Sequence, residues 1–161
     1  MLQFDENGHL TPITPIETTL DEFQQVFVDA FPRSITRKPL FDNYLDWVFD
    51  FQRDIFGYFT QWIDGSFVTR KENPNDIDFV TFLDEEVYVL RNTKLDRFWS
   101  FSNESRGLDA YIMPEYKHNH PNFALLEERK KIWLDLFTSV RAIEDQPKLN
   151  KGFIQISFIK S

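Results

Sequence analysis

Apolar residues recur at helical spacing in the first third of the chain and predict two helices there. Thr19 and Glu22 have the spacing of a capping box, in which each side chain accepts a free backbone N–H of the first turn. Apolar positions then recur every three or four residues until a proline, which predicts a helix over residues 20–31. A second pattern predicts the longest helix, over residues 40–59, with Gly57 near its end.

Shorter apolar runs bounded by turn-forming residues predict four strands. The chain before the first helix contains glycine and prolines, and we expect it to be extended. The predicted strands end at Ile63, begin near Asp76, and cover residues 108–113 and 152–159. Two further helices are predicted over residues 85–101, with a break near Asn92, and over residues 122–142. The order of elements indicates an α/β domain with a small mixed β-sheet flanked by helices.

Composition narrows the class of protein. A chain of 161 residues is long enough for one core, and we predict a single domain over residues 1–161. With 26 acidic against 18 basic residues the formal charge is -8, which disfavours a broad DNA- or RNA-binding surface. There is no cysteine, the first residues lack a basic segment, and no window approaches eighteen apolar residues. These features predict a cytoplasmic protein without membrane association.

One segment carries candidate chemistry, a Gly65-Ser66 pair followed by Asp76-Ile77-Asp78. Alternate residues of a strand point to the same face, so Asp76 and Asp78 would present two carboxylates together. Two like charges at such a short distance repel each other, and a divalent cation relieves the repulsion. A glycine in the preceding turn lets backbone amides approach an anion closely. The pattern therefore favours a metal-nucleotide site.

This pattern resembles the signature of the DNA polymerase beta-type nucleotidyltransferase superfamily. The whole chain also resembles a family of small bacterial proteins within it. The shared features are an N-terminal Phe-x-x-x-Gly-x-Leu, a Trp-Ile-Asp-Gly-Ser-Phe-x-Thr core, and a late Lys-Gly before a strand, here Lys151-Gly152. The resemblance implies a minimal nucleotidyltransferase-like domain that carries two N-terminal helices.

The resemblance also implies a reaction, the transfer of a nucleoside monophosphate from an NTP such as ATP to an acceptor. Two Mg²⁺ or Mn²⁺ ions would bridge the triphosphate and the attacking hydroxyl. A third carboxylate on a third strand would hold the second metal. The implied roles are metal binding and catalysis by Asp76, Asp78 and Asp109, and nucleotide binding by Gly65, Ser66, Arg70 and Lys71.

Each acidic candidate also has a structural interpretation. Asp76 and Asp78 could form a solvated strand edge or a turn, because Asn-Pro-Asn-Asp is rich in turn formers. Asp109 could cap a turn at the start of its strand. Asp64 comes directly before the Gly-Ser pair, and we expect it to tether that loop rather than to bind metal.

The basic candidates are fewer. Arg70 and Lys71 follow the Gly-Ser pair and could reach triphosphate oxygens, or they could simply be solvated. Arg141 and Lys151 flank the last predicted strand and belong to the resemblance. No cysteine nucleophile and no phosphate-binding Walker pattern is present in the sequence.

Three functional hypotheses follow. The protein is an active nucleotidyltransferase acting on a protein, an RNA end or a small molecule; or an antitoxin-like or regulatory protein that binds a partner toxin; or a degenerate nucleotide-binding module. Related enzymes add a substrate-binding helical region, whereas here only one helix and one strand follow Met113. The acceptor pocket would therefore be open, completed by the N-terminal helices, or supplied by a second subunit.

Overall fold

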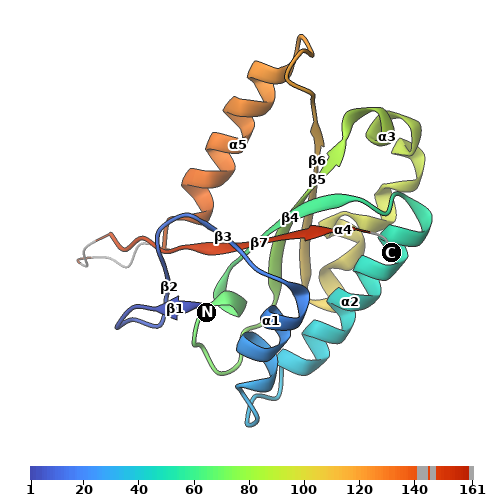
Figure 1. Cartoon of the computed structure of the whole chain (residues 1–161). Helices are drawn as coiled ribbons and strands as arrows, with labels where there is room; N and C mark the ends of the chain where they lie inside the picture. The colour runs from blue at the N-terminus through green and yellow to red at the C-terminus, as the bar shows by residue number, and fades with distance from the viewer. Residues whose placement is uncertain (141–144, 146–147, 160–161) are drawn as a thin grey trace.

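A five-stranded mixed sheet with the order β3-β7-β4-β5-β6 forms the centre of the computed structural model (Figure 1). The structure describes residues 1–140, 145 and 148–159. Strand β4 is antiparallel to both β5 and β7, whereas β5 pairs with β6, and β3 with β7, in parallel. The strands are β3 (Pro15–Glu17), β4 (Phe59–Asp64), β5 (Ile77–Asp84), β6 (Leu108–Glu115) and β7 (Phe153–Phe158). A separate antiparallel pair consists of β1 (Gln3–Phe4) and β2 (Leu10–Thr11).

Helices flank both faces of this sheet (Figure 1). The N-terminal helices pack on one face, and the last helix covers part of the other. The described helices are α1 (Leu20–Gln24) with a π-helical turn η1 (Gln25–Asp29), α2 (Arg37–Asp54), α3 (Glu85–Leu90), α4 (Ser100–Asn103) and α5 (Phe123–Phe137). The predicted α/β class, with a small mixed sheet between helices, is confirmed. Within the described residues, no helix has the length and apolar character needed to span a membrane.

Two helix boundaries differ from the sequence prediction. The Thr19 hydroxyl accepts the Glu22 N–H at 3.1 Å, as the capping box requires, but the helix divides into α1 and η1. The helix predicted over residues 40–59 begins earlier and ends at Asp54. Phe59 instead opens β4, where it packs against aromatic rings of α2 and β7. Tertiary packing of this ring overrides the helical spacing of the local sequence.

The remaining differences lie near the ends of the chain and around α3. The predicted break near Asn92 is confirmed, because short 3₁₀ turns separate α3 from α4. The helix predicted over residues 122–142 ends at Phe137, and its last predicted residue, Ala142, lies outside the described residues. The extended N-terminal segment forms a hairpin and then adds β3 to the edge of the main sheet.

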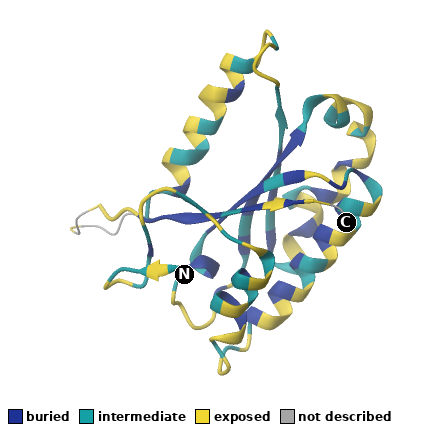
Figure 2. Cartoon of the chain, in the orientation of Figure 1, coloured by how far each residue is buried: buried dark blue, intermediate teal, exposed yellow. Residues whose placement is uncertain are grey.

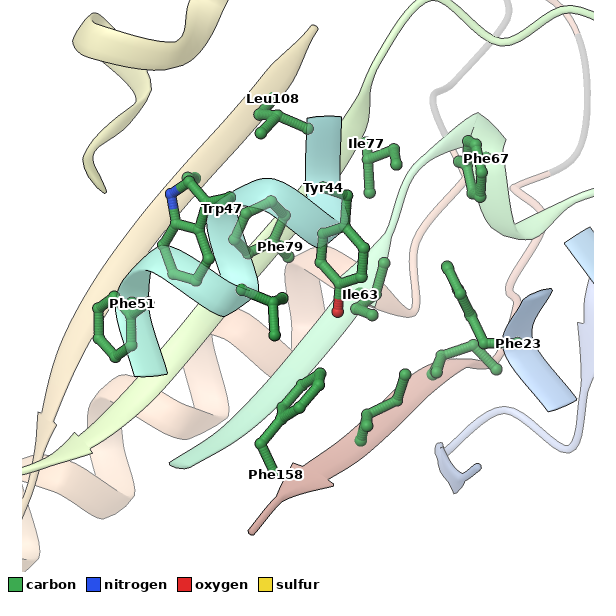
Figure 3. Packing of buried hydrophobic residues seen from close by; sticks show 14 of the residues in the cluster. Phe23, Tyr44, Trp47, Phe51, Ile63, Phe67, Ile77, Phe79, Leu108 and Phe158 are labelled. Carbon is green, nitrogen blue, oxygen red and sulfur yellow. The ribbon is translucent and has the colours of Figure 1, made fainter. Parts of the chain in front are cut away.

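The face covered by α2 contains the main core (Figure 3). Tyr44, Trp47 and Phe51 are spaced three and four residues apart, so they share one face of α2 and are buried. Trp47 stacks on Phe51 and meets Phe79 of β5 edge to face, with ring centroids 4.8 and 4.9 Å apart. Burying each such side chain contributes about 1.5–3 kcal/mol. This packing fixes α2 to the sheet.

The opposite face is less completely covered. Most of α5 is exposed or half-buried (Figure 2), and only Leu126 and Phe137 are buried in that helix. A smaller apolar cluster joins Phe137 to Trp62, Val80 and Phe82 of the sheet. The first residues of β5 and β6 therefore border hollows on the α5 face, and the candidate site lies there.

Candidate functional site

Strand register brings three aspartates into one row across the sheet. Asp64 at the end of β4 pairs with Asp78 of β5, and Asp78 pairs with Asp109 of β6. Directly paired residues of neighbouring strands point to the same face, so all three side chains lie on the α5 face. Asp78 and Asp109 thus come together from neighbouring strands, as the predicted site requires.

Asp76 lies just outside this row. Strand β5 begins at Ile77, so Asp76 belongs to the segment that leads into the strand rather than to the strand itself. Asp76 and Asp109 both line a hollow of ≈ 430 Å³ beside α4. Asp109 also lines a second hollow of ≈ 310 Å³, which it shares with Asp64, Asp78 and the α5 residues Trp133, Leu136 and Phe137. Asp109 therefore borders both spaces.

The carboxylates repel one another in a partly buried setting. Burial raises the pKa of Asp78 to about 8, with further contributions from the negative charge of Asp76 and from a hydrogen bond and charge at Asp109. Burial and then the charge of Asp109 raise the pKa of Asp76, while the positive charge of Lys71 opposes that rise. At neutral pH the Asp78 carboxyl therefore keeps a proton.

Gly65 lies against the Asp78 carboxylate. Its φ of +81° is in the region that side chains rarely adopt, and a Cβ built on it would overlap the Asp78 carboxyl group. Glycine is therefore required at this turn for two independent reasons. Half-buried Ser66 follows and begins a short 3₁₀ turn, which closes when the Thr69 hydroxyl donates to the Ser66 carbonyl at 2.6 Å. The structure thus brings Gly65 and Asp78 into contact.

The chain after this turn is held by Arg37, a residue that sequence reasoning missed. Its side chain is only 1% exposed, and its guanidinium donates to the carbonyls of Phe67, Thr69 and Lys71 and to that of Phe27. These five bonds use all five donors of the group. A single arginine at the start of a helix gives no local signal of such a role, because its partners are backbone atoms 30–34 residues away or on another helix.

The two predicted basic residues differ in position. The Arg70 guanidinium lies 4.8 Å from the ring centre of Phe4, so this side chain packs against the N-terminal hairpin. Lys71 is exposed and close enough to Asp76 for its charge to affect that carboxyl. Of the two, Lys71 is therefore the one that the structure brings near an aspartate of the site.

Asp64 and Lys151 form a buried ion pair at the other end of the row. The Lys151 ammonium donates to the Asp64 carboxylate and, at 3.2 Å, to the carbonyl of Phe137 in α5. This arrangement agrees with the expected tethering role of Asp64. Arg141, the other basic residue singled out at the last strand, lies outside the described residues.

Two further residues contact the carboxylates, and one of them, Ser100, has no sequence signal. The Ser100 hydroxyl lies 2.6 Å from Asp109 Oδ1 and 2.9 Å from the Ala110 carbonyl. Tyr111, two residues after Asp109, shares its face, and burial followed by the charge of Asp109 raises the pKa of its hydroxyl. The ring of Trp133 packs on Tyr111 with centroids 5.2 Å apart.

The donor set suits a hard divalent cation, although the ligands are not assembled. In the described part of the chain, no group of three or more acidic or histidine side chains is arranged to hold a metal ion. Carboxylate oxygens are nevertheless the ligands that Mg²⁺ and Mn²⁺ prefer. Burial is the main cause of the raised pKa of Asp78, and a cation would offset the further contribution from the charge of Asp76. Binding would require Asp78 to lose its proton.

Comparison with known proteins gives one match. No curated protein and no solved structure matches the chain. One family model, described as a family of unknown function (DUF6932), matches residues 2–157 and thus nearly the whole chain. The protein therefore belongs to the DUF6932 family.

Proposed function

We propose that this protein is a metal-dependent nucleotidyltransferase that uses Mg²⁺ or Mn²⁺ and transfers a nucleoside monophosphate from an NTP to an acceptor hydroxyl. The observation that carries the proposal is the contact of Gly65 with Asp78, combined with the register pairing of Asp78 with Asp109. A metal-bound triphosphate needs paired carboxylates beside a turn whose backbone can approach an anion, and in this proposal Gly65 would supply that turn.

Each residue has a role in the proposed reaction. The turn at Gly65 and Ser66 would hold the terminal phosphates, and Arg37 keeps the backbone of the following segment fixed. Asp76, Asp78 and Asp109 would hold the metal ions, which when bound neutralise charge on the triphosphate and lower the pKa of the acceptor hydroxyl.

The transfer itself is an in-line displacement at the α-phosphorus. The acceptor oxygen forms a bond to this phosphorus while the bond to the bridging oxygen breaks, and the electron pair of that bond leaves with pyrophosphate. The hydroxyl proton passes to Asp109. The Ser100 hydroxyl, 2.6 Å from Asp109 Oδ1, orients that carboxylate.

Two hollows border Asp109, and the proposal places one substrate in each. The N-terminal helices cover the other face of the sheet, so they do not complete an acceptor pocket on the site's face. The space beside α4 is lined by Asp76, Ser100, Phe101 and Asp109, and the residues of the Gly65 turn are not among its lining. We assign the acceptor to this space.

The proposal is tested by incubating the purified protein with Mg²⁺ or Mn²⁺ and each labelled NTP in turn. Label is then sought on the protein itself, on co-purified RNA and on proteins from a cell extract, and calorimetry measures nucleotide binding with and without metal. Metal-dependent transfer that is lost in Asp78→Asn supports the enzyme. Metal-dependent binding without transfer to any acceptor supports a binding module or a partner-binding regulator. No metal-dependent signal up to millimolar NTP refutes the nucleotide site.

A further inference from the structure

Lys151 has an environment that is unusual for a lysine. It is 6% exposed, and its partner Asp64 is 7% exposed, so the ion pair is almost fully removed from water. Lysine is rarely buried unless it is paired, because the charged ammonium is costly to desolvate. Its backbone is held as well, since its N–H donates to the Thr138 carbonyl at 2.9 Å. Both main chain and side chain are therefore fixed.

A short series of contacts runs from this ammonium to the candidate site. Lys151 bonds Asp64, which is the residue directly before Gly65, and Gly65 lies against the Asp78 carboxyl group. Asp64 also pairs with Asp78 in the strand register. Any displacement of Asp64 must therefore move the Gly65 turn relative to Asp78.

The same ammonium also contacts α5, the helix that lines the hollow beside the aspartates. Its second bond, at 3.2 Å, goes to the carbonyl of Phe137 at the end of α5. Phe137 and Trp133 of α5 line the hollow that contains Asp64, Asp78 and Asp109. The Lys151 ammonium thus connects the Gly65 turn and the row of aspartates to α5, which lines the hollow beside them.

We propose that Lys151 is a positioning residue: through Asp64 it fixes the Gly65 turn against Asp78, and through Phe137 it fixes α5 over the carboxylates. The expected consequence is that breaking the ion pair weakens nucleotide binding, and this consequence rests on the proposed function. Lys151 itself does not contact the nucleotide in this scheme.

The test compares Lys151→Met, Asp64→Asn and the double variant with Lys130→Met as a control. Lys130 is a half-buried lysine of α5 that pairs with Glu115 at 3.7 Å on the same face, away from the turn. Three quantities are measured for each protein: the melting temperature, the affinity for Mg²⁺-ATP, and deuterium uptake of the peptide that contains residues 62–70.

A positioning role predicts a specific set of results. Lys151→Met loses at least tenfold in nucleotide affinity and takes up deuterium faster in residues 62–70, whereas Lys130→Met changes neither. The double variant leaves no unpaired buried charge, so its melting temperature recovers relative to the single variants. Its nucleotide affinity stays low, because the anchor of the turn is still missing.

Other results overturn the proposal. If the single variants melt earlier but bind Mg²⁺-ATP like the wild type, the pair only stabilises the fold. If the double variant recovers affinity together with melting temperature, the unpaired charge and not the anchor causes the loss. A wild type that binds no nucleotide refutes the proposed function instead. In that case deuterium uptake still tests whether Lys151 fixes the Gly65 turn. Unchanged uptake in both Lys151→Met and the double variant refutes that positioning role.

Discussion

The two faces of the central sheet bury polar groups in different ways. Beneath α2 the buried Tyr44 hydroxyl donates to Gln61 at 2.6 Å, and Gln61 donates to Thr81 at 3.0 Å, so polar atoms there are satisfied by neutral partners. Beneath α5, three aspartates form a row across the end of β4 and the beginnings of β5 and β6, and burial raises the pKa of Asp78 to about 8. One face is built for stability, whereas the other gathers carboxyl groups side by side.

The difference indicates where function lies. Burying like charges side by side costs stability, and groups with strongly shifted pKa values concentrate at functional sites. The aromatic core on the α2 face stabilises the fold, while α5 leaves hollows above the aspartates. We therefore expect variants on the α2 face to change stability, and variants on the α5 face to change ligand binding or transfer.

The largest expected effect is on the α5 face, in Asp109→Ala. Nucleotide can be held by one metal and the Gly65 turn, but in-line attack requires the second metal and its third carboxylate. Transfer should fall at least about 1000-fold, equivalent to about 4 kcal/mol of barrier, while Mg²⁺-ATP affinity changes less than tenfold. Single-turnover transfer and calorimetry on the same preparation measure both quantities.

Ser100→Ala is the matched control for this variant, because it removes the hydrogen bond to Asp109 but keeps the carboxylate. We expect it to slow transfer far less than Asp109→Ala. Equal loss of binding and transfer in Asp109→Ala would show that Asp109 holds the nucleotide rather than the reacting metal, and the two-metal mechanism would be withdrawn.

On the α2 face the largest expected effect is on stability. Trp47→Ala leaves a cavity beneath α2 and removes the bond from its indole N–H to the Phe98 carbonyl, 3.0 Å long. The free energy of unfolding should fall by about 3–5 kcal/mol. Trp133→Ala on α5 removes a half-buried ring and should cost less, about 1–2 kcal/mol. Urea titrations compare the two, and equal losses would show that α5 packs as firmly as α2.

Much of the fold follows from local patterns, and the exceptions have physical causes. The helical spacing of the α2 residues predicts that helix because it reflects burial of one face, and the apolar run of β5 predicts that strand because both of its faces are buried. The end of α2 could not be located, since Phe59 fits the helical spacing and yet packs in the sheet. Strand β3 has only three residues, too few for a pattern to be recognised.

The candidate site was predictable only where the sequence places residues near one another. Gly65 and Asp78 could be paired from their spacing on consecutive strands. The link from Lys151 to Asp64 spans 87 residues, and the bonds of Arg37 go to backbone carbonyls, which no side-chain pattern encodes. Arg70 illustrates the converse, because its sequence position beside Lys71 does not reveal that its side chain packs on Phe4.

A smaller effect concerns the pH dependence of stability. Between pH 4 and pH 8 the folded protein keeps a proton on Asp78 that the unfolded chain releases, so its free energy of unfolding should fall as pH rises. The slope contributed by one group is at most about 1.4 kcal/mol per pH unit. Asp78→Asn removes this contribution and should be more stable than the wild type by about 1–2 kcal/mol at pH 8.

Denaturant titrations of the metal-free proteins at pH 5, 6.5 and 8 measure this difference. The affinity of the wild type for Mn²⁺ should rise over the same interval, because the metal competes with the proton on Asp78. If Asp78→Asn is instead less stable than the wild type at pH 8, Asp78 has a stabilising partner in the fold. The site would then not reduce stability, as a functional site of this kind is expected to do.

The smallest expected effect separates the two basic residues next to the turn. Lys71 is near Asp76, whereas Arg70 packs against Phe4. Lys71→Ala should therefore weaken Mg²⁺-ATP binding about three- to tenfold, with a loss that shrinks at high salt because the side chain is exposed. Arg70→Ala should leave affinity within about twofold and lower the free energy of unfolding by about 0.5–1 kcal/mol through the lost contact with the ring. Calorimetry at low and high ionic strength compares them. A larger loss of affinity in Arg70→Ala would mean that the arginine leaves Phe4 when nucleotide binds, and the N-terminal hairpin would then belong to the site.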